Sequence, residues 1–264
     1  MLRDGYQCLT IPRSGAYRFE VIGARNESEP GARIIGEVRL EKGEKITVAL
    51  GQTGSHYGCG TGGTFVVKEN STSDPQPLFV AAGAGSAGCV PDDFSKASLT
   101  QTASGNDKIG SSGVQIYFDK NQNSTDSENG SHNDIYCGGA GFWEGPVTGE
   151  LREDSVAPKS YKDGLIGGKG IDEYGDLAEG GFGGGGASYY RNGLVYYGAG
   201  GGYTGGGIKI YNDEYCDGGG GGSFSIDDGA RSTTLTEITE NVQLLISIKI
   251  SCLIKCRIKT EIII

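Results

Sequence analysis

Three glycine-rich stretches match the G-x-G-x-x-G pattern of loops that bind nucleotide phosphates. They span residues 58–63, 181–186 and 200–205, and Lys68 follows the first of them. Phosphate binding by such a loop also requires a helix amino terminus or a covering hairpin, with a placed lysine and metal-binding acids. The kinase motifs H-R-D and D-F-G are absent, and the stretch 164–170 lacks the P-loop's Ser or Thr after its lysine. Because 49 of 264 residues are glycine, such matches arise readily, and we predict no nucleotide and no cofactor.

Hydrolytic and metal chemistry also lack a suitable set of residues. The sequence has no G-x-S-x-G motif, and its two histidines, His56 and His132, lie in polar stretches. Four pairs of neighbouring acids could act as glycosidase carboxylates or calcium ligands. They are Asp92-Asp93, Glu153-Asp154, Asp172-Glu173 and Asp227-Asp228. Solvated loop charges explain these pairs more simply, so we predict no catalytic residue and no metal ligand.

Seven cysteines leave at least one thiol over if the others pair. Cys252 and Cys256 lie near the carboxyl end, and the spacings among the other five are too wide for a typical zinc site. We take those five as candidate disulfide cysteines, with the pairing open. They are Cys8, Cys59, Cys89, Cys137 and Cys216.

Four N-x-[ST] sequons mark candidate N-glycosylation sites, which would lie in surface loops of a secreted protein. The acceptor residues are Asn26, Asn70, Asn123 and Asn129. The amino terminus has no apolar stretch typical of a secretory signal. We therefore expect an extracellular or cell-surface protein, with the chain an incomplete copy of it.

Charge and hydropathy exclude two kinds of partner. The net charge of −10 disfavours nucleic acid and anionic membranes, because phosphate binding requires a basic surface. The most apolar stretch, 242–264, is interrupted by Lys, Arg and Glu side chains, so we predict no transmembrane span. The expected partner is a protein ligand or a second copy of the chain.

Alternation of apolar and charged residues predicts β-strands in the first part of the chain. The period is two at 17–21, 34–40 and 46–50. The polar, glycine-containing link at 41–45 predicts a hairpin between the last two. Shorter apolar runs follow at 64–67, 78–82 and 114–118, and no stretch has a helical period. We therefore predict a strand-rich part over about 5–118 within an all-β domain spanning 1–240.

Glycine dominates the later part of the domain, about 138–230. Roughly one residue in three is glycine between 138 and 222, but the strict period and prolines of collagen are missing. The glycine runs alternate with aromatic and β-branched residues, which solvated linkers lack. We therefore favour ordered glycine, in which extended segments lie close together and pair their backbone N–H and C=O groups.

Two polar or amphipathic segments complete this division of the chain. The stretch at about 95–133 is poor in apolar residues, and we predict an exposed loop there. Residues 241–264 form an amphipathic tail whose status the sequence leaves uncertain, because alternate apolar and basic positions predict a strand without an obvious partner.

The order of the motifs resembles the extracellular glycine-rich region of the anaplastic lymphoma kinase and leukocyte tyrosine kinase receptors. The series covers residues 5–230: the strand and turn at 17–24, the hairpin at 40–54, then 62–66, 78–83, the glycine-rich stretch with Trp143, 180–186, 200–206 and 217–224. This resemblance implies an antiparallel β-sandwich joined to packed left-handed polyglycine helices, in an ectodomain that binds protein ligands.

The functional prediction is therefore a non-catalytic extracellular protein-recognition module from which the receptor kinase domain is absent. The alternative is a structural or adhesive surface or matrix protein, in which the ordered glycine segments form a rigid spacer.

Overall fold

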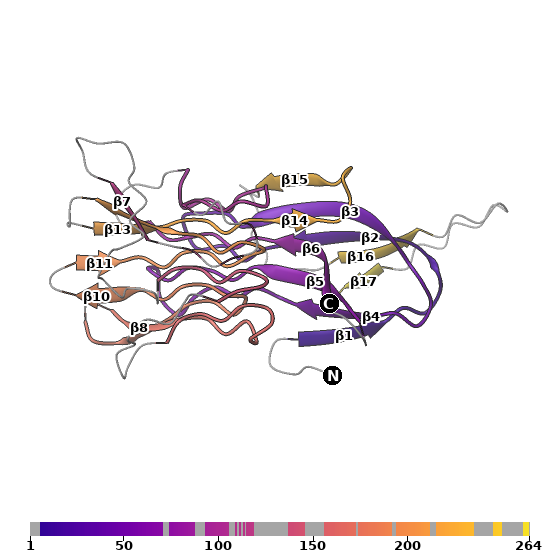
Figure 1. Ribbon diagram of the computed structural model, residues 1–264, viewed down its shortest axis with the longest axis horizontal. Helices are drawn as coiled ribbons and strands as arrows, with labels where there is room; N and C mark the ends of the chain where they lie inside the picture. The colour runs from indigo at the N-terminus through magenta and orange to yellow at the C-terminus, as the bar shows by residue number, and fades with distance from the viewer. Residues whose placement is uncertain are drawn as a thin grey trace.

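The computed structural model describes residues 6–70, 74–87, 93–105, 109, 111, 113, 115–118, 137–145, 156–172, 174–191, 194–211, 215–234, 245–249 and 261–263. These residues form seventeen strands. None of them belongs to a helix, and hence none to a helix long and apolar enough to cross a membrane. The protein is therefore all-β, as predicted. Figure 1 shows strands gathered at both ends of an elongated molecule, joined by long, nearly parallel segments.

Two five-stranded antiparallel sheets make up one end. The first has the order β1-β4-β5-β6-β14, with bounds Tyr6–Thr10, Lys45–Ala49, Thr64–Glu69, Gln76–Ala81 and Phe224–Ser225. The second has the order β15-β3-β2-β16-β17, with bounds Arg231–Thr234, Ala32–Leu40, Gly15–Ile22, Leu245–Lys249 and Glu261–Ile263. Strands β2 to β6 confirm the five strands that were predicted between residues 17 and 82.

Side chains that alternate along the strands form the core between these two sheets. Tyr17, Phe19 and Val21 of β2 are fully buried, whereas Arg18 between them is exposed. The ring of Phe19 lies 5.3 Å from that of Phe79 in β6. The period of two therefore reports one buried face and one solvated face of the second sheet.

The first sheet is buried on both faces. Its second face carries Phe65, Val67 and Val80, which pack against Phe142 and Tyr161 from the later part of the chain. Burial on both faces explains why 64–67 and 78–82 are continuous apolar runs instead of alternating ones.

The predicted hairpin at 41–45 is wrong. Strand β3 pairs with β2 and β15, whereas β4 pairs with β1 and β5. The turn, in which Gly43 has φ +89°, therefore carries the chain from one sheet to the other. Crossing between the sheets places Ile34 and Leu40 of β3 and Ile46 and Val48 of β4 in the one core that the two sheets share.

The tail has the partner that the sequence did not reveal. Strand β16 pairs with β2 from Leu245 opposite Glu20 to Lys249 opposite Ala16, and β17 pairs with β16. Residues 245–249 and 261–263 of the tail, whose status the sequence left uncertain, thus pair within the second sheet. The pairing protects the edge of β2.

The opposite end of the molecule carries a smaller sheet and a two-stranded ribbon (Figure 1). The sheet has the order β10-β11-β13-β12-β7, with bounds Tyr189–Arg191, Leu194–Tyr196, Tyr215–Gly218, Ile208–Tyr211 and Gln115–Phe118. The ribbon pairs β8 (Lys169–Ile171) with β9 (Leu177–Glu179). Strand β7 confirms the strand predicted at 114–118.

Glycine-rich segments occupy the middle of the molecule, and we call them the glycine lattice. They comprise residues 58–63, 82–86, 137–142, 180–186, 198–203, 204–207 after a bend at 202–203, and 218–223, nearly all buried. Segment 198–203 shows how they are joined. Each pair of N–H donors three residues apart in this segment bonds to carbonyl groups of the same neighbouring segment, at N···O distances of 2.6–3.3 Å. Gly198 and Gly201 donate to Gly58 and Thr61, and Ala199 and Gly202 donate to Cys137 and Ala140. Gly200 and Tyr203 donate to Gly219 and Gly222.

The same period of three recurs in other lattice segments. Gly218 and Gly221 donate to Ser86 and Gly83. The carbonyl groups of segment 198–203 accept bonds from three further segments, around residues 83–86, 186 and 206. One lattice segment is thus held by six neighbours through main-chain bonds alone.

Close approach explains the requirement for glycine. A Cβ added at Gly62 would lie 1.7 Å from the carbonyl oxygen of Phe182, and most other lattice glycines would meet backbone atoms in the same way. Only Gly183 and Gly184 of the lattice have a positive φ. Glycine is therefore required here mainly by space.

Residues 93–105 correct part of the exposed loop that was predicted at 95–133. Ser95 and Ala97 are buried. The N–H groups of Gly220 and Ser223 donate to Phe94 and Thr100 in this stretch. The main chain of this stretch thus pairs with the lattice, and the polarity of its side chains did not reveal that role. Residues 119–133 lie outside the described part of the chain.

Candidate binding cleft

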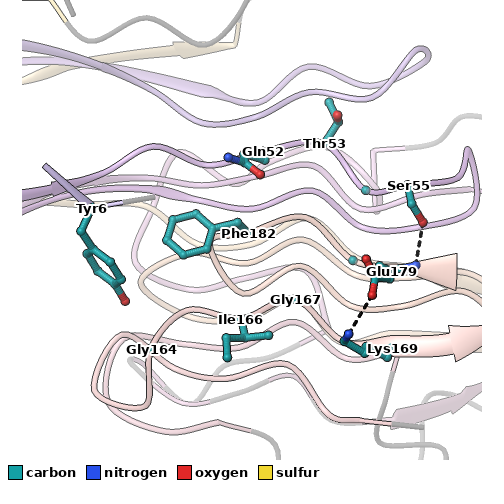
Figure 2. A pocket seen from close by; sticks show the side chains of 12 residues that line it. Tyr6, Gln52, Thr53, Ser55, Gly164, Ile166, Gly167, Lys169, Glu179 and Phe182 are labelled. Atoms are coloured by element: carbon teal, nitrogen blue, oxygen red, sulfur yellow. Dashed lines mark hydrogen bonds and ion pairs between the residues drawn. The ribbon is translucent and has the colours of Figure 1, made fainter. Parts of the chain in front are cut away.

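An open cleft of about 660 Å³ lies beside the glycine lattice (Figure 2). Three segments form it: a floor at 179–182, one wall at 52–55 and the other wall at 164–169, with Tyr6 of β1 at one end. Its lining residues are Tyr6, Gln52, Thr53, Gly54, Ser55, Gly164, Ile166, Gly167, Lys169, Glu179, Gly180 and Phe182.

Main-chain bonds fix the floor between the two walls. On one side, the N–H groups of Gln52 and Ser55 donate to the carbonyl oxygens of Phe182 and Glu179, both at 2.8 Å. On the other side, the Gly180 N–H donates to Gly168 at 2.8 Å. The width of the cleft is therefore set by backbone geometry and not by side-chain rotamers.

One end of the cleft is aromatic. The rings of Tyr6 and Phe182 meet edge to face, with centroids 5.5 Å apart, and the side chain of Ile166 is 45% exposed. Burial, and then the negative charge of Glu69, raise the pKa of Tyr6 to about 12. The Tyr6 phenol is therefore neutral at pH 7 and can donate a hydrogen bond.

The other end is polar (Figure 2). Lys169 Nζ lies 2.9 Å from Glu179 Oε1, and the Glu179 N–H donates to Ser55 Oγ at 2.7 Å. Both side chains of the ion pair are partly exposed, so the pair contributes little to stability. Its two charges remain available to a ligand.

A histidine, an acid and a cysteine lie near the polar end of the cleft, and each contacts structural partners. His56 Nδ1 accepts the Gly58 N–H at 3.4 Å, and its Nε2 lies 3.6 Å from Asp172 Oδ2. Both ring nitrogens thus face structural partners. Burial raises the pKa of the Cys59 thiol, which opposes its activation as a thiolate.

Asp172 is buried and not the solvated charge expected for its acid pair. Its Oδ1 accepts the N–H groups of Tyr174 and Asp176 and so holds the turn between β8 and β9. Asp227 similarly accepts the N–H groups of Glu37 and Gly229. Among the described residues, no group of three or more His, Cys, Asp and Glu could hold a metal ion.

The candidate glycosylation sites differ in their surroundings. Asn26 Nδ2 donates to the Gly85 carbonyl at 2.7 Å, and its Oδ1 accepts the Glu29 N–H. Asn70 Nδ2 donates to Asp74 at an exposed position. Asn123 and Asn129 lie outside the described residues.

The candidate disulfide cysteines are dispersed. Cys8 in β1 is exposed, whereas the thiols of Cys59 and Cys137 are buried in the lattice. Cys89 lies outside the described residues, and so does the side chain of Cys216 in β13. Their pairing remains a prediction.

The sequence did not reveal the cleft residues as a group. Tyr6, Ser55 and Lys169 lie far apart in the chain, and each has an ordinary local context. The glycine matches at 58–63 and 181–186 were the only nearby signal. These glycines allow the close packing of the floor against the lattice segment 58–63.

Comparison of the chain with protein-family models found no matching model, and a search of curated proteins found no significant match.

Proposed function

We propose that this chain is a non-catalytic, extracellular protein-recognition module, and that the glycine lattice is a rigid platform for the cleft. The observation that carries the proposal is the fixed floor, which is bonded to both walls through the backbone. A preorganised cleft binds without the entropic cost of ordering its walls. The mixture of aromatic, charged and main-chain groups is typical of a site that recognises polypeptide.

We further propose that the lattice segments are left-handed helices of the polyglycine type, with about three residues per turn. Donors three residues apart that bond to one neighbour support this proposal, since a β-strand repeats every two residues. An all-β fold with buried glycine runs supports the resemblance to the glycine-rich region of the receptor family. In that case the chain is part of a receptor-like ectodomain.

Binding to folded proteins tests the recognition proposal. The purified chain would be immobilised and exposed, one at a time, to secreted proteins and receptor ectodomains from its own organism in biolayer interferometry. We expect at least one partner with a Kd of about 10 µM or tighter, and equal binding after enzymatic removal of any glycans from the chain. If every member of the panel fails to bind at ten times that concentration, the proposal is wrong.

Mass spectrometry of the chain secreted from eukaryotic cells tests its extracellular character. We expect a glycan on Asn70, which is removed by a peptide N-glycosidase. An unmodified Asn70 in the secreted protein would contradict the expectation that this sequon serves as a surface acceptor.

A further inference from the structure

The cleft lies where the glycine lattice ends. Segment 198–203 is hydrogen-bonded to six neighbouring segments. The floor segment 179–182, by contrast, borders the open cleft between its two walls (Figure 2). In the part of the chain that the structure describes, no residue occupies this position. The floor thus has room beside it where the segments of the lattice interior have a neighbour.

Main-chain groups around this space are uncommitted. Thr53 and Gly54 on one wall, and Gly167 on the other, make no hydrogen bond through N–H or C=O to any described residue. Four of the twelve lining residues are glycine, so at these positions no Cβ atom keeps an incoming backbone at a distance. Such walls suit a ligand that offers its own backbone N–H and C=O groups.

We propose that the cleft binds an extended, glycine-rich segment of a partner protein as one additional member of the lattice. This inference rests on the proposed recognition function and names the chemistry of its partner. The bound segment has about three residues per turn, so that two of every three peptide groups face the walls and the third faces solvent. It is the lattice counterpart of strand addition to an open sheet edge.

The aromatic end of the cleft specifies one side chain of that segment. Within the lattice, the ring of Tyr203 stacks on Phe224 with centroids 4.6 Å apart and lies 5.9 Å from Phe142. Tyr6 and Phe182 offer a similar pair of ring surfaces. The partner segment therefore carries an aromatic residue flanked by glycines.

The chain itself supplies a suitable probe. A synthetic decapeptide with the sequence of residues 198–207 has lattice-forming glycines around a single tyrosine. Its binding to the intact protein would be measured by isothermal titration calorimetry. The control is the same peptide with valine at the positions of Gly200, Gly201 and Gly202, because three added side chains prevent the close approach. We expect at least about tenfold weaker binding of the valine peptide, which corresponds to about 1.4 kcal/mol.

N-methylation of the peptide, one amide at a time, tests the geometry without changing the protein. Each methyl group removes one backbone donor. In a segment with three residues per turn, we expect binding to fall at two of every three positions and to stay unchanged at the third. Loss at alternate positions would indicate a β-strand instead and would overturn the lattice geometry.

A matched pair of variants locates the peptide. Ile166→Trp places a larger side chain in the cleft, whereas Ile226→Trp alters an exposed isoleucine that follows β14, at the opposite edge of the first sheet from Tyr6. We expect Ile166→Trp to weaken peptide binding about tenfold or more and Ile226→Trp to leave it unchanged. Equal binding by both variants, or no binding of the peptide to the unmodified chain, would overturn this inference. Neither result decides whether the cleft recognises a folded protein that lacks such a segment, which the panel tests separately.

Discussion

The sandwich and the glycine lattice are both buried, but they are packed by opposite means. In the sandwich, large side chains such as Phe19 and Phe79 fill the space between sheets. In the lattice, glycine lets the backbones approach so closely that carbonyl oxygens lie next to the positions that Cβ atoms of other residues would take. The sandwich is therefore sensitive to the removal of atoms, and the lattice to their addition.

This difference explains how a chain with only 36% hydrophobic residues can be ordered. Glycine loses more conformational entropy on folding than other residues, so the lattice requires a large compensating term. Main-chain hydrogen bonds supply that compensation, as between segment 198–203 and its six neighbouring segments. Dense backbone packing adds to it. Aromatic side chains such as Phe142 and Tyr161 then join the lattice to the first sheet.

The largest expected effect is that of adding one carbon atom to the lattice. In Gly62→Ala, the new Cβ would lie 1.7 Å from the Phe182 carbonyl oxygen, and neither backbone can move without breaking its own bonds. We expect a loss of more than about 4 kcal/mol in the free energy of unfolding, measured by urea denaturation.

Gly15→Ala is the matched control in the sandwich. An added Cβ at Gly15 meets no atom within 4 Å, and its φ is not positive. We expect a change between zero and a gain of about 1 kcal/mol, because alanine restricts the unfolded chain. Equal destabilisation by the two variants would show that the lattice has no special intolerance of Cβ atoms.

The complementary change removes atoms from the sandwich. Phe79→Ala deletes a fully buried ring that contacts Phe19. We expect a loss of about 3–5 kcal/mol and a smaller loss for Phe79→Leu, both measured by thermal and urea unfolding. Should Phe79→Ala cost less than about 1 kcal/mol, side-chain packing would not be what holds this end together.

Alkaline pH tests the junction between the two regions. Burial, and then the charge of Glu69, raise the pKa values of Tyr6 and Tyr161, that of Tyr6 to about 12. Because an unfolded tyrosine titrates near pH 10, the stabilisation is complete below about pH 10 and is lost as the pH rises through 12. We expect the free energy of unfolding to fall over this range.

Tyr161→Phe separates the two tyrosines. It removes the hydrogen bond from Tyr161 to Glu69 Oε1, 2.9 Å long, at a cost of about 1 kcal/mol at pH 7. The variant should also show a shallower alkaline decline, because one titrating group is gone. An unchanged slope between pH 10 and 12 would mean that Tyr161 is not held in its neutral form by the fold.

Alkylation of the cysteines tests the closed packing of the lattice without any substitution. Cys8 is exposed in β1, whereas Cys59 and Cys137 are buried in the lattice, and burial raises the pKa of Cys59. With iodoacetamide in the native state, we expect Cys8 to react at least about a hundredfold faster than either buried thiol. Similar rates at all three positions, read by peptide mass spectrometry, would contradict a closed lattice.

Sequence patterns predicted the two regions unequally. Alternation located β2 and β3 because each has one solvated face, and it located β4 although that strand is buried on both faces. It did not show that the turn at Gly43 changes sheets, since strand pairing depends on distant partners. Glycine density located the lattice. It did not reveal the cleft, because the 52–55 wall is bonded to floor residues more than a hundred positions later in the chain, and the contact between 164–169 and the floor leaves no repeating pattern in the sequence.

The most direct test of the account is amide hydrogen exchange of segment 198–203, compared with β5 (Thr64–Glu69) in the sandwich. If main-chain bonds order the lattice, the amides of Gly198, Gly200 and Gly201 exchange as slowly as those of β5 and through the same global unfolding. Exchange of these glycine amides at the rate of an unstructured peptide, while β5 stays protected, would contradict the lattice and the functions proposed for it.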